Sequence, residues 1–289
     1  MTSAVATGVE VRPIILDAYG ISLSALVGTP AGAPRGTILA LHGAGMSAGY
    51  FHGSANPGAS LLRLGAELGM TVLAVDRPGY RLSAVRLPDG QYLADQAAAV
   101  AAAVRDFATR YPTGAGVVVA AHSFGGKVAL ALAAGGSVPD LLGLDISGCG
   151  HRYVVAATDL PGAGAGRPRV AGWGPLRLYP PDTFRSSRDV VAPLPAREAQ
   201  EARRWPGTFL ELAPAVRVPV RFTFAEYEPW WQHDPDTLTD LRSRLAAAPH
   251  VRTERQLYAG HNISLGWTAR SHHLRVIGFA EELIAAKGI

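Results

Sequence analysis

The chain has 289 residues, of which 48% are hydrophobic and 17% are charged, and its formal net charge is +4. This composition excludes a disordered protein and allows a large buried core. No apolar run approaches the roughly 20 residues that span a bilayer, and the positive charge, almost all arginine, forms no basic stripe of the kind that binds nucleic acid.

Apolar runs alternate with helical segments along most of the chain. Eight strands are predicted: Val9–Leu16, Ile21–Gly28, Gly36–His42, Thr71–Val75, a run from Gly116 that stops at Ser123, Leu141–Ser147, Val218–Tyr227 and Val251–Tyr258. Helices are predicted at Leu61–Leu68, Leu93–Tyr111, after Ser123, and at Arg197–Leu212, Asp236–Ala247 and Trp267–Ala286. The first two strands favour an antiparallel hairpin at a sheet edge. The alternation that follows predicts an α/β protein with a doubly wound, mostly parallel eight-stranded sheet.

The alternation breaks between Gly148 and Arg217, where prolines and glycines are frequent and no strand is predicted. The strand pattern then resumes. We therefore expect residues 1–150 and 218–289 to form one core and 151–217 to be an insertion into it. The run Gly162–Gly166 is of low complexity and predicts a mobile loop.

The most informative stretch is Ala121-His122-Ser123-Phe124-Gly125. A strand, a tight turn and a helix are compressed into it, with a small residue two positions before the serine and a glycine two positions after. A serine on such a turn has its hydroxyl pushed out of the sheet, as in a nucleophile elbow. Ser123 is the predicted nucleophile, and a serine that only caps the helix is the alternative.

A serine nucleophile needs a base, and the base needs a carboxylate that orients it. His261 directly follows the last predicted strand, at the edge where parallel sheets bind ligands. Glu228 follows the preceding strand and is the favoured acid. Asp145, on the strand beside the elbow strand, is the rival acid, and Glu226 is a weaker one.

The developing oxyanion requires two N–H donors. We expect them to be the backbone N–H groups of Phe124 and of Ala44, the latter in a glycine-rich loop. The further pocket candidates lie near strand ends or are aromatic: His42, Gly43, Gly45, His122, Cys149, Trp173, Trp205 and Trp230. No metal site is predicted, because the histidines lack ligand spacing.

Together these motifs resemble the α/β-hydrolase superfamily over nearly the whole chain. The matching stretches are 42–45, 76–80, 121–126 and 260–261. The resemblance implies a serine hydrolase of the esterase or thioesterase kind, without a cofactor, in which 151–217 acts as a lid. There are two departures: Glu228 stands where Asp is usual, and Arg81 stands where Gly is usual.

Other functions compete with this one. Carbon–carbon bond hydrolysis and non-hydrolytic lyase or cyclase chemistry fit the same residues, and a catalytically silent ligand receptor would keep the same fold. Glycines from Gly43 to Gly49, with Asp76 as a ribose ligand, would suit a nicotinamide-dependent oxidoreductase. That alternative leaves the elbow and His261 without a role.

The expected substrate is a hydrophobic small molecule, because the aromatic side chains of the insertion would roof the pocket. The arginines of the insertion keep the lid solvated or, as a more specific hypothesis, attract an anionic substrate or an acidic carrier. A single cysteine, Cys149, and no secretory signal at the N-terminus lead us to expect a cytoplasmic protein. The sequence does not predict an oligomeric state.

Overall fold

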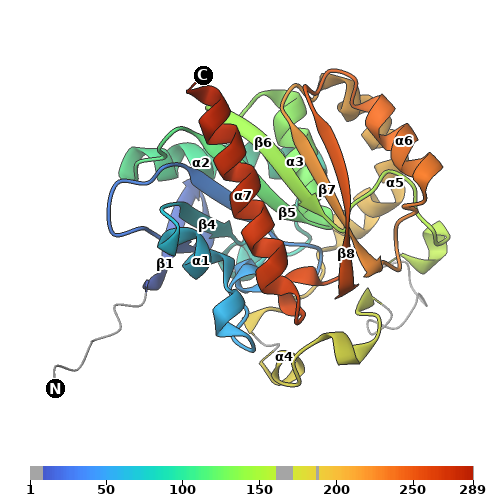
Figure 1. Cartoon of the computed structure of the whole chain (residues 1–289), viewed down its shortest axis with the longest axis horizontal. Coiled ribbons are helices and arrows are strands. Elements are labelled where there is room, and N and C mark those ends of the chain that lie inside the picture. Colours follow the sequence, from blue (N-terminus) through green and yellow to red (C-terminus); the bar gives the residue numbers. More distant parts are fainter. Residues whose placement is uncertain (1–8, 161–171, 187–188, 289) are drawn as a thin grey trace.

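A computed structural model of the chain describes residues 9–160, 172–186 and 189–288, and at its centre lies an eight-stranded sheet (Figure 1). The strand order is β1-β2-β4-β3-β5-β6-β7-β8. The strands are β1 (Val11–Ala18), β2 (Ile21–Gly28), β3 (Thr37–Leu41), β4 (Thr71–Val75), β5 (Val117–His122), β6 (Leu141–Ser147), β7 (Val220–Tyr227) and β8 (Val251–Gly260). The predicted fold class is confirmed.

The sheet combines an antiparallel edge with a parallel centre. β1 pairs with β2 and β2 with β4 in antiparallel register, which confirms the predicted hairpin at the edge. The pairs from β4 through β3, β5, β6 and β7 to β8 are all parallel. The carboxyl ends of six strands therefore meet at one edge of the sheet, which is where such sheets bind ligands.

Helices cover both faces of the sheet (Figure 1). They are α1 (Leu61–Glu67), α2 (Leu93–Arg110), α3 (Phe124–Gly135), α6 (Pro235–Arg244) and α7 (Ala269–Lys287). On β3, Ile38 and Ala40 pack in one core cluster with α1 and α7, whereas Leu39 and Leu41 pack in the other with α2 and α3. Burial on both faces explains why the central strands are continuous apolar runs in the sequence.

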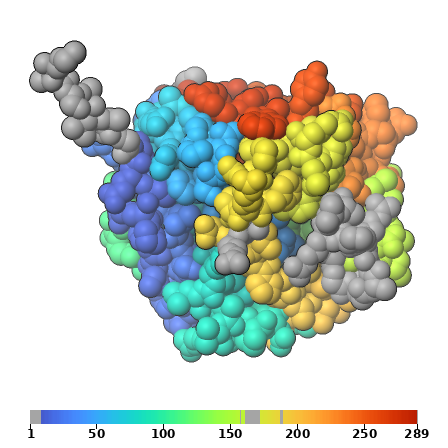
Figure 2. Space-filling model, turned by 90° about the horizontal axis from the view of Figure 1, so that it is seen from below, coloured from blue at the N-terminus to red at the C-terminus, as the bar shows by residue number. Residues whose placement is uncertain are grey.

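The segment between β6 and β7 contains α4 (Asp182–Arg185) and α5 (Ala196–Leu212), and its described residues form no strand. The predicted helix at Arg197–Leu212 matches α5, whereas the four-residue α4 was not predicted because it is too short to show a helical period. Figure 2 shows this segment, in yellow and gold, across the middle of one face of the molecule. The glycine-rich run 162–166 lies outside the described residues.

None of the helices in the described ranges is long and apolar enough to cross a membrane.

Two glycines inside helices allow a test of how tightly the layers pack. A Cβ at Gly65 of α1 would lie 2.3 Å from Cγ2 of buried Val72, whereas a Cβ at Gly278 of α7 would meet no atom within 4 Å outside its own helix. Alanine brings the same gain in helix propensity at both positions, up to about 1 kcal/mol. We expect Gly278→Ala to raise the free energy of unfolding and Gly65→Ala to lower it by about 1–3 kcal/mol through overpacking. Urea denaturation would measure both, and equal stabilisation would contradict the close packing of α1 on β4.

Candidate active site

Ser123 lies at the turn between β5 and α3 with a backbone conformation that serine rarely adopts. Its φ is +52° and its ψ is −115°. The Ser123 N–H donates a hydrogen bond of 2.8 Å to the carbonyl oxygen of Ser147 at the end of β6. Strain of this kind persists only where the surrounding structure imposes it, and it is concentrated at functional sites. The half-buried Ser123 lines a pocket at the carboxyl ends of the strands.

Close packing against two neighbouring strand ends imposes this turn. A Cβ at Gly125 would lie 2.2 Å from the carbonyl oxygen of Leu41, and one at Gly126 would lie 2.7 Å from Cγ2 of Ile146. The glycines after the serine therefore allow α3 to begin directly on β3 and β6. Because the helix begins at Phe124, the N–H of that residue has no acceptor within the helix and is available to a ligand.

His261, after β8, contacts Glu228, after β7. The His261 Nδ1 lies 2.9 Å from both carboxylate oxygens, and the two side chains are 7% and 0% exposed. The N–H of Trp230 donates to the same carboxylate, at 3.2 Å. Because a carboxylate only accepts hydrogen bonds, the contact requires the proton on Nδ1, which leaves Nε2 of a neutral imidazole as an acceptor.

His261 lies beside the elbow. Its ring centroid is 4.7 Å from that of His122, the residue before Ser123. Both rings also pack closely against Gly148, where a Cβ would lie 2.9 Å from Cε1 of His261 and 3.0 Å from Cε1 of His122. The ends of β5, β6 and β8 thus bring the elbow and the histidine–carboxylate pair to the same edge of the sheet.

The two rival carboxylates are engaged elsewhere. Asp145 on β6 forms a buried ion pair of 2.6 Å with Arg221 on β7. Arg221 in turn donates to the backbone carbonyl of Arg275 on α7, so this pair faces the helix layer. Glu226 accepts a hydrogen bond of 2.7 Å from the backbone N–H of Tyr258 on β8. Of the three candidate acids, Glu228 is the one in contact with His261.

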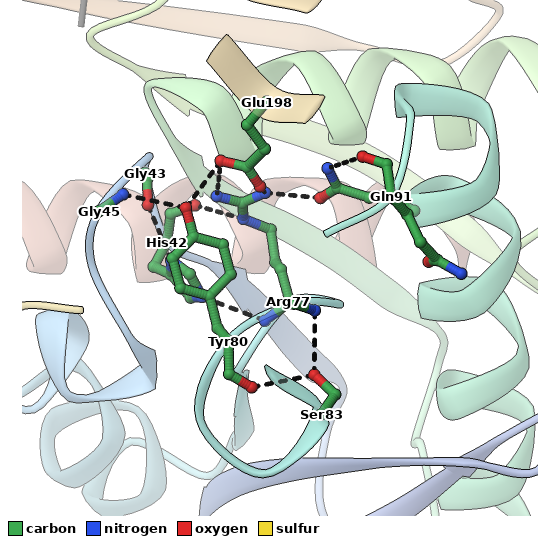
Figure 3. A network of polar contacts seen from close by, with 10 residues as sticks. His42, Gly43, Gly45, Arg77, Tyr80, Ser83, Gln91 and Glu198 are labelled. Atoms are coloured by element: carbon green, nitrogen blue, oxygen red, sulfur yellow. Dashed lines mark hydrogen bonds and ion pairs between the residues drawn. The ribbon is translucent and has the colours of Figure 1, made fainter. Parts of the chain in front are cut away.

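A buried polar network holds the loop that contains Ala44 (Figure 3). The hydroxyl of Tyr80 accepts a hydrogen bond of 3.0 Å from the N–H of Gly45 and donates one of 2.7 Å to Glu198 of α5. The Arg77 side chain donates to the carbonyl of His42 at 2.8 Å and forms a bidentate ion pair with Glu198. A helix of the insertion is therefore bonded, through two side chains, to the loop after β3.

His42 lies at the start of this loop, and Arg81 lies after β4, in the neighbouring loop. The imidazole of His42 accepts the N–H of Arg77 at Nε2 and contacts the Gly43 carbonyl at Nδ1. Burial and the nearby Arg77 lower the pKa of His42 well below its usual value, which keeps it neutral. Arg81 has a φ of +47°, and this left-handed conformation explains why glycine is usual at that position of the motif.

The pocket combines the nucleophile with apolar and aromatic side chains. It is lined by Ala44, Ser123, Phe124, Lys127, Tyr153, Leu160, Leu194, Glu198, Ala199, Ala202, Trp230 and Trp231. Of the pocket candidates taken from the sequence, Trp230 is in this lining. Both residues expected to supply the oxyanion donors also line it.

The other pocket candidates lie around this lining, not in it. His42, Gly43 and Gly45 form the loop described above, and the ring of His122 stacks on Tyr50 at 4.6 Å. Cys149 is buried, which raises the pKa of its thiol to about 12. Trp205 donates its indole N–H to the carbonyl of Gly150 at 2.7 Å. Trp173 packs at 5.1–5.2 Å against Tyr179 and Phe184 at the edge of the insertion.

Sequence reasoning missed Lys127, Glu198 and Tyr153. Lys127 had a signal, because it is a lysine in an otherwise apolar helix of a chain with only two lysines. Glu198 and Tyr153 had none, since their positions depend on how the insertion folds back onto the core.

The structure also bears on dinucleotide binding and on metal binding. The carboxylate of Asp76, the ribose ligand of the dinucleotide alternative, accepts hydrogen bonds of 2.7 Å from Ser24 and from the N–H of Ala48. It is thus occupied within the protein. Within the described ranges, no cluster of three or more His, Cys, Asp or Glu side chains could hold a metal ion.

A serine on a strained strand-to-helix turn, beside a buried histidine–carboxylate pair on an eight-stranded sheet, is the arrangement of an α/β-hydrolase. A family model described as the alpha/beta hydrolase family matches residues 38–278, and the chain belongs to this family. No curated protein matches the chain.

Several solved structures are similar over nearly their full length. One is a thermostable carboxyl esterase from Bacillus coagulans in complex with glycerol (19% identity, TM-score 0.70, covering 95% of this chain and 99% of that one). Another is an N-acyl homoserine lactonase, AidH, in complex with N-hexanoyl homoserine (17% identity, TM-score 0.66, covering 95% of this chain and 98% of that one). A third is the thioesterase domain from the curacin biosynthetic pathway (15% identity, TM-score 0.62, covering 96% of this chain and 99% of that one). At these identities the likeness is one of fold.

The strain at Ser123 predicts a gain in stability when the side chain is removed. A conformation of this kind costs about 1–3 kcal/mol, and glycine avoids that cost while losing about 0.5–1 kcal/mol through its freer unfolded chain. We expect Ser123→Gly to raise the free energy of unfolding by about 1 kcal/mol relative to Ser123→Ala, which keeps the Cβ. Urea denaturation of the two variants is the measurement. A glycine variant no more stable than the alanine variant would contradict the strain.

Proposed function

We propose that the protein is a serine hydrolase that cleaves an ester, thioester or lactone of a hydrophobic small molecule through an acyl-enzyme. The observation that carries this proposal is the presence of the strained Ser123 turn and the buried His261–Glu228 pair at one edge of the sheet. Both features cost the fold stability. A serine in this conformation costs stability, and a buried imidazole–carboxylate pair costs desolvation.

In the proposed reaction, Ser123 Oγ attacks the carbonyl carbon while Nε2 of His261 takes the hydroxyl proton. The Glu228 carboxylate holds Nδ1–H and stabilises the imidazolium that forms. The N–H groups of Ala44 and Phe124 bind the developing oxyanion. The intermediate then collapses, the alcohol or thiol leaves with the proton from His261, and water hydrolyses the acyl-enzyme with the same groups.

The pocket supports a small, largely apolar acyl group. Its walls include the side chains of Phe124, Tyr153, Leu160, Trp230 and Trp231. The insertion contributes Tyr153, Leu160, Leu194 and three residues of α5 to the lining, in keeping with a lid over the site. The esterase, the lactonase and the thioesterase with the same fold are named for ester, lactone and thioester bonds, the three acyl bonds of the proposal.

Covalent labelling tests the nucleophile directly. A fluorophosphonate reacts with an activated serine, so intact-protein mass spectrometry should show one adduct on the wild type and none on Ser123→Ala. His261→Ala should slow labelling, and either variant should lower kcat on an activated ester by roughly 10⁴–10⁶. Both should remain folded by circular dichroism. Near-normal turnover by Ser123→Ala would exclude the acyl-enzyme, and labelling without ester hydrolysis would favour lyase or carbon–carbon bond chemistry.

Two amide substitutions separate the acid from its rival. Glu228→Gln keeps the shape but removes the charge that stabilises the imidazolium, so kcat should fall by up to about 10⁴ with little change in Tm. Asp145→Asn removes the close partner of the buried Arg221 and leaves it only the longer contact of 3.9 Å with Glu254, so Tm should fall while kcat per folded molecule stays near that of the wild type. The kinetics should be read beside thermal unfolding of both variants. A large loss of kcat in Asp145→Asn alone would reverse the assignment.

A further inference from the structure

Lys127 is a buried cation next to the nucleophile that the proposed hydrolysis does not use. It is 3% exposed and lines the same pocket as Ser123. It is one of only two lysines in the chain. A lysine is almost never fully buried without a partner, since transfer of an ammonium from water to an apolar site is costly.

The surroundings of the ammonium group are aromatic. Its Nζ donates a hydrogen bond of 2.8 Å to the hydroxyl of Tyr153, whose own proton goes to the carbonyl of Ala202. It also lies 5.0 Å from the ring centroid of Phe124, 5.5 Å from Tyr153, 5.4 Å from Trp205 and 5.6 Å from Trp231. Ring faces attract a cation, but they accept no strong hydrogen bond, and an ammonium has three donors.

No carboxylate of the described residues forms an ion pair with this charge. Glu198 lines the same pocket, but its oxygens are bonded to Arg77 and Tyr80. Glu201, on the same helix, forms its ion pair of 3.8 Å with Arg204. Burial lowers the pKa of Lys127 to about 8, so most of it is still charged at pH 7.

The position of Lys127 relative to Ser123 limits the size of a ligand that could reach both. Ser123 is the residue before α3 and Lys127 is the fourth residue of that helix, so about one helical turn separates them, and both line the pocket. An acyl group whose carbonyl is at Ser123 would place an atom a few bonds further along near the ammonium. Phe124 and Trp231 line the same pocket, and their apolar surfaces suit methylene groups.

We propose that Lys127 binds a carboxylate at the far end of the acyl group, so that the preferred substrate is a half-ester or half-thioester of a short dicarboxylic acid. This inference rests on the proposed function and names its substrate class. The carboxylate would accept hydrogen bonds from Lys127 and form the ion pair that Glu198, bonded to Arg77 and Tyr80, does not form with it. Water then cleaves the ester bond, giving the dicarboxylate and the alcohol or thiol.

The arginines of the insertion offer a different source of anion attraction, but those among the described residues do not line the pocket. Arg152 pairs with Asp240 at 2.9 Å, Arg185 with Asp182 at 3.1 Å, and Arg197 donates to the carbonyl of Gly90. Arg167, Arg169 and Arg188 lie outside the described residues. Exposed arginines act over long range and are screened by salt, whereas a buried ammonium is screened much less. Salt dependence therefore separates the two sources.

The kinetic test compares p-nitrophenyl half-esters of succinate, glutarate and adipate with the matching esters whose free carboxyl is a primary amide. A charged hydrogen bond is worth about 1.5–3 kcal/mol, or roughly 10- to 150-fold. For at least one chain length, wild-type kcat/KM should favour the acid over its amide at least 10-fold. That ratio should change little between low and moderate salt.

Lys127→Met should bring the acid-to-amide ratio to about one. Lys287→Met, the same substitution at the other lysine, should keep the wild-type ratio, because Lys287 pairs with Asp140 at the far end of α7. Fluorophosphonate labelling of Lys127→Met at Ser123 shows that its elbow is intact. No acid preference in the wild type, or an equal, salt-sensitive preference in Lys127→Met, would overturn the proposal.

A binding measurement keeps this site separate from the hydrolase function. Calorimetry should show that the best dicarboxylate binds Ser123→Ala at least 10-fold more tightly than it binds the double variant that also carries Lys127→Met. Wild-type labelling and neutral-ester hydrolysis without this difference would refute the carboxylate site alone. The binding difference without fluorophosphonate labelling would refute the hydrolase and leave the site standing.

Discussion

The close approach of three strand ends at the turn after β5 is the constraint on which the rest of the site depends. The carbonyl oxygen of Leu41 leaves no room for a side chain at Gly125, and the carbonyl of Ser147 fixes the N–H of Ser123. Because these contacts fix the chain on both sides of the serine, they hold the backbone of Ser123 at a positive φ. The cost of that conformation is met by the buried sheet around it, whose central strands are apolar on both faces.

A second constraint joins the insertion to the core. The Arg77–Glu198 pair is fully buried, and removal of either partner would leave a charge without compensation. Tyr80 extends the pair to the N–H of Gly45, next to the expected oxyanion donor. The position of α5 and the shape of the loop after β3 are thus linked by hydrogen bonds. A movement of the insertion would have to break them or carry the loop with it.

The same helix α5 also shapes the pocket around Lys127. Trp205 and the backbone of Ala202 come from α5, whereas Lys127 and Phe124 come from α3. The two helices place a positive charge among aromatic rings in the pocket that Ser123 also lines. A pocket with mostly apolar walls and one buried ammonium can select both the length and the charge of an acyl group.

The sequence by itself determined the order and type of nearly every element, because central strands buried on both faces are unbroken apolar runs and the helices between them are long. It also brought out Ser123 and His261, since the elbow is local and the histidine directly follows a strand. Its place after a strand favoured Glu228 over Asp145 as the acid, but the sequence did not decide between the two. Which carboxylate meets His261 depends on the face to which each strand end turns, and the tertiary structure pairs Asp145 with Arg221 instead.

Only the tertiary structure decided the polar interior of the pocket. Lys127, Tyr153 and Glu198 are far apart in the chain, and their contacts arise because the insertion folds back across α3 and the loop after β3. No local pattern encodes such contacts: a lysine in an apolar helix is unusual, but the sequence around it does not show which residues it meets. Trp205 and Trp173 could be named from the sequence as pocket candidates, but their positions outside the described lining follow from the path of a segment with no periodicity. Local periodicity thus sufficed for the sheet and the elbow, and long-range packing was required for the pocket.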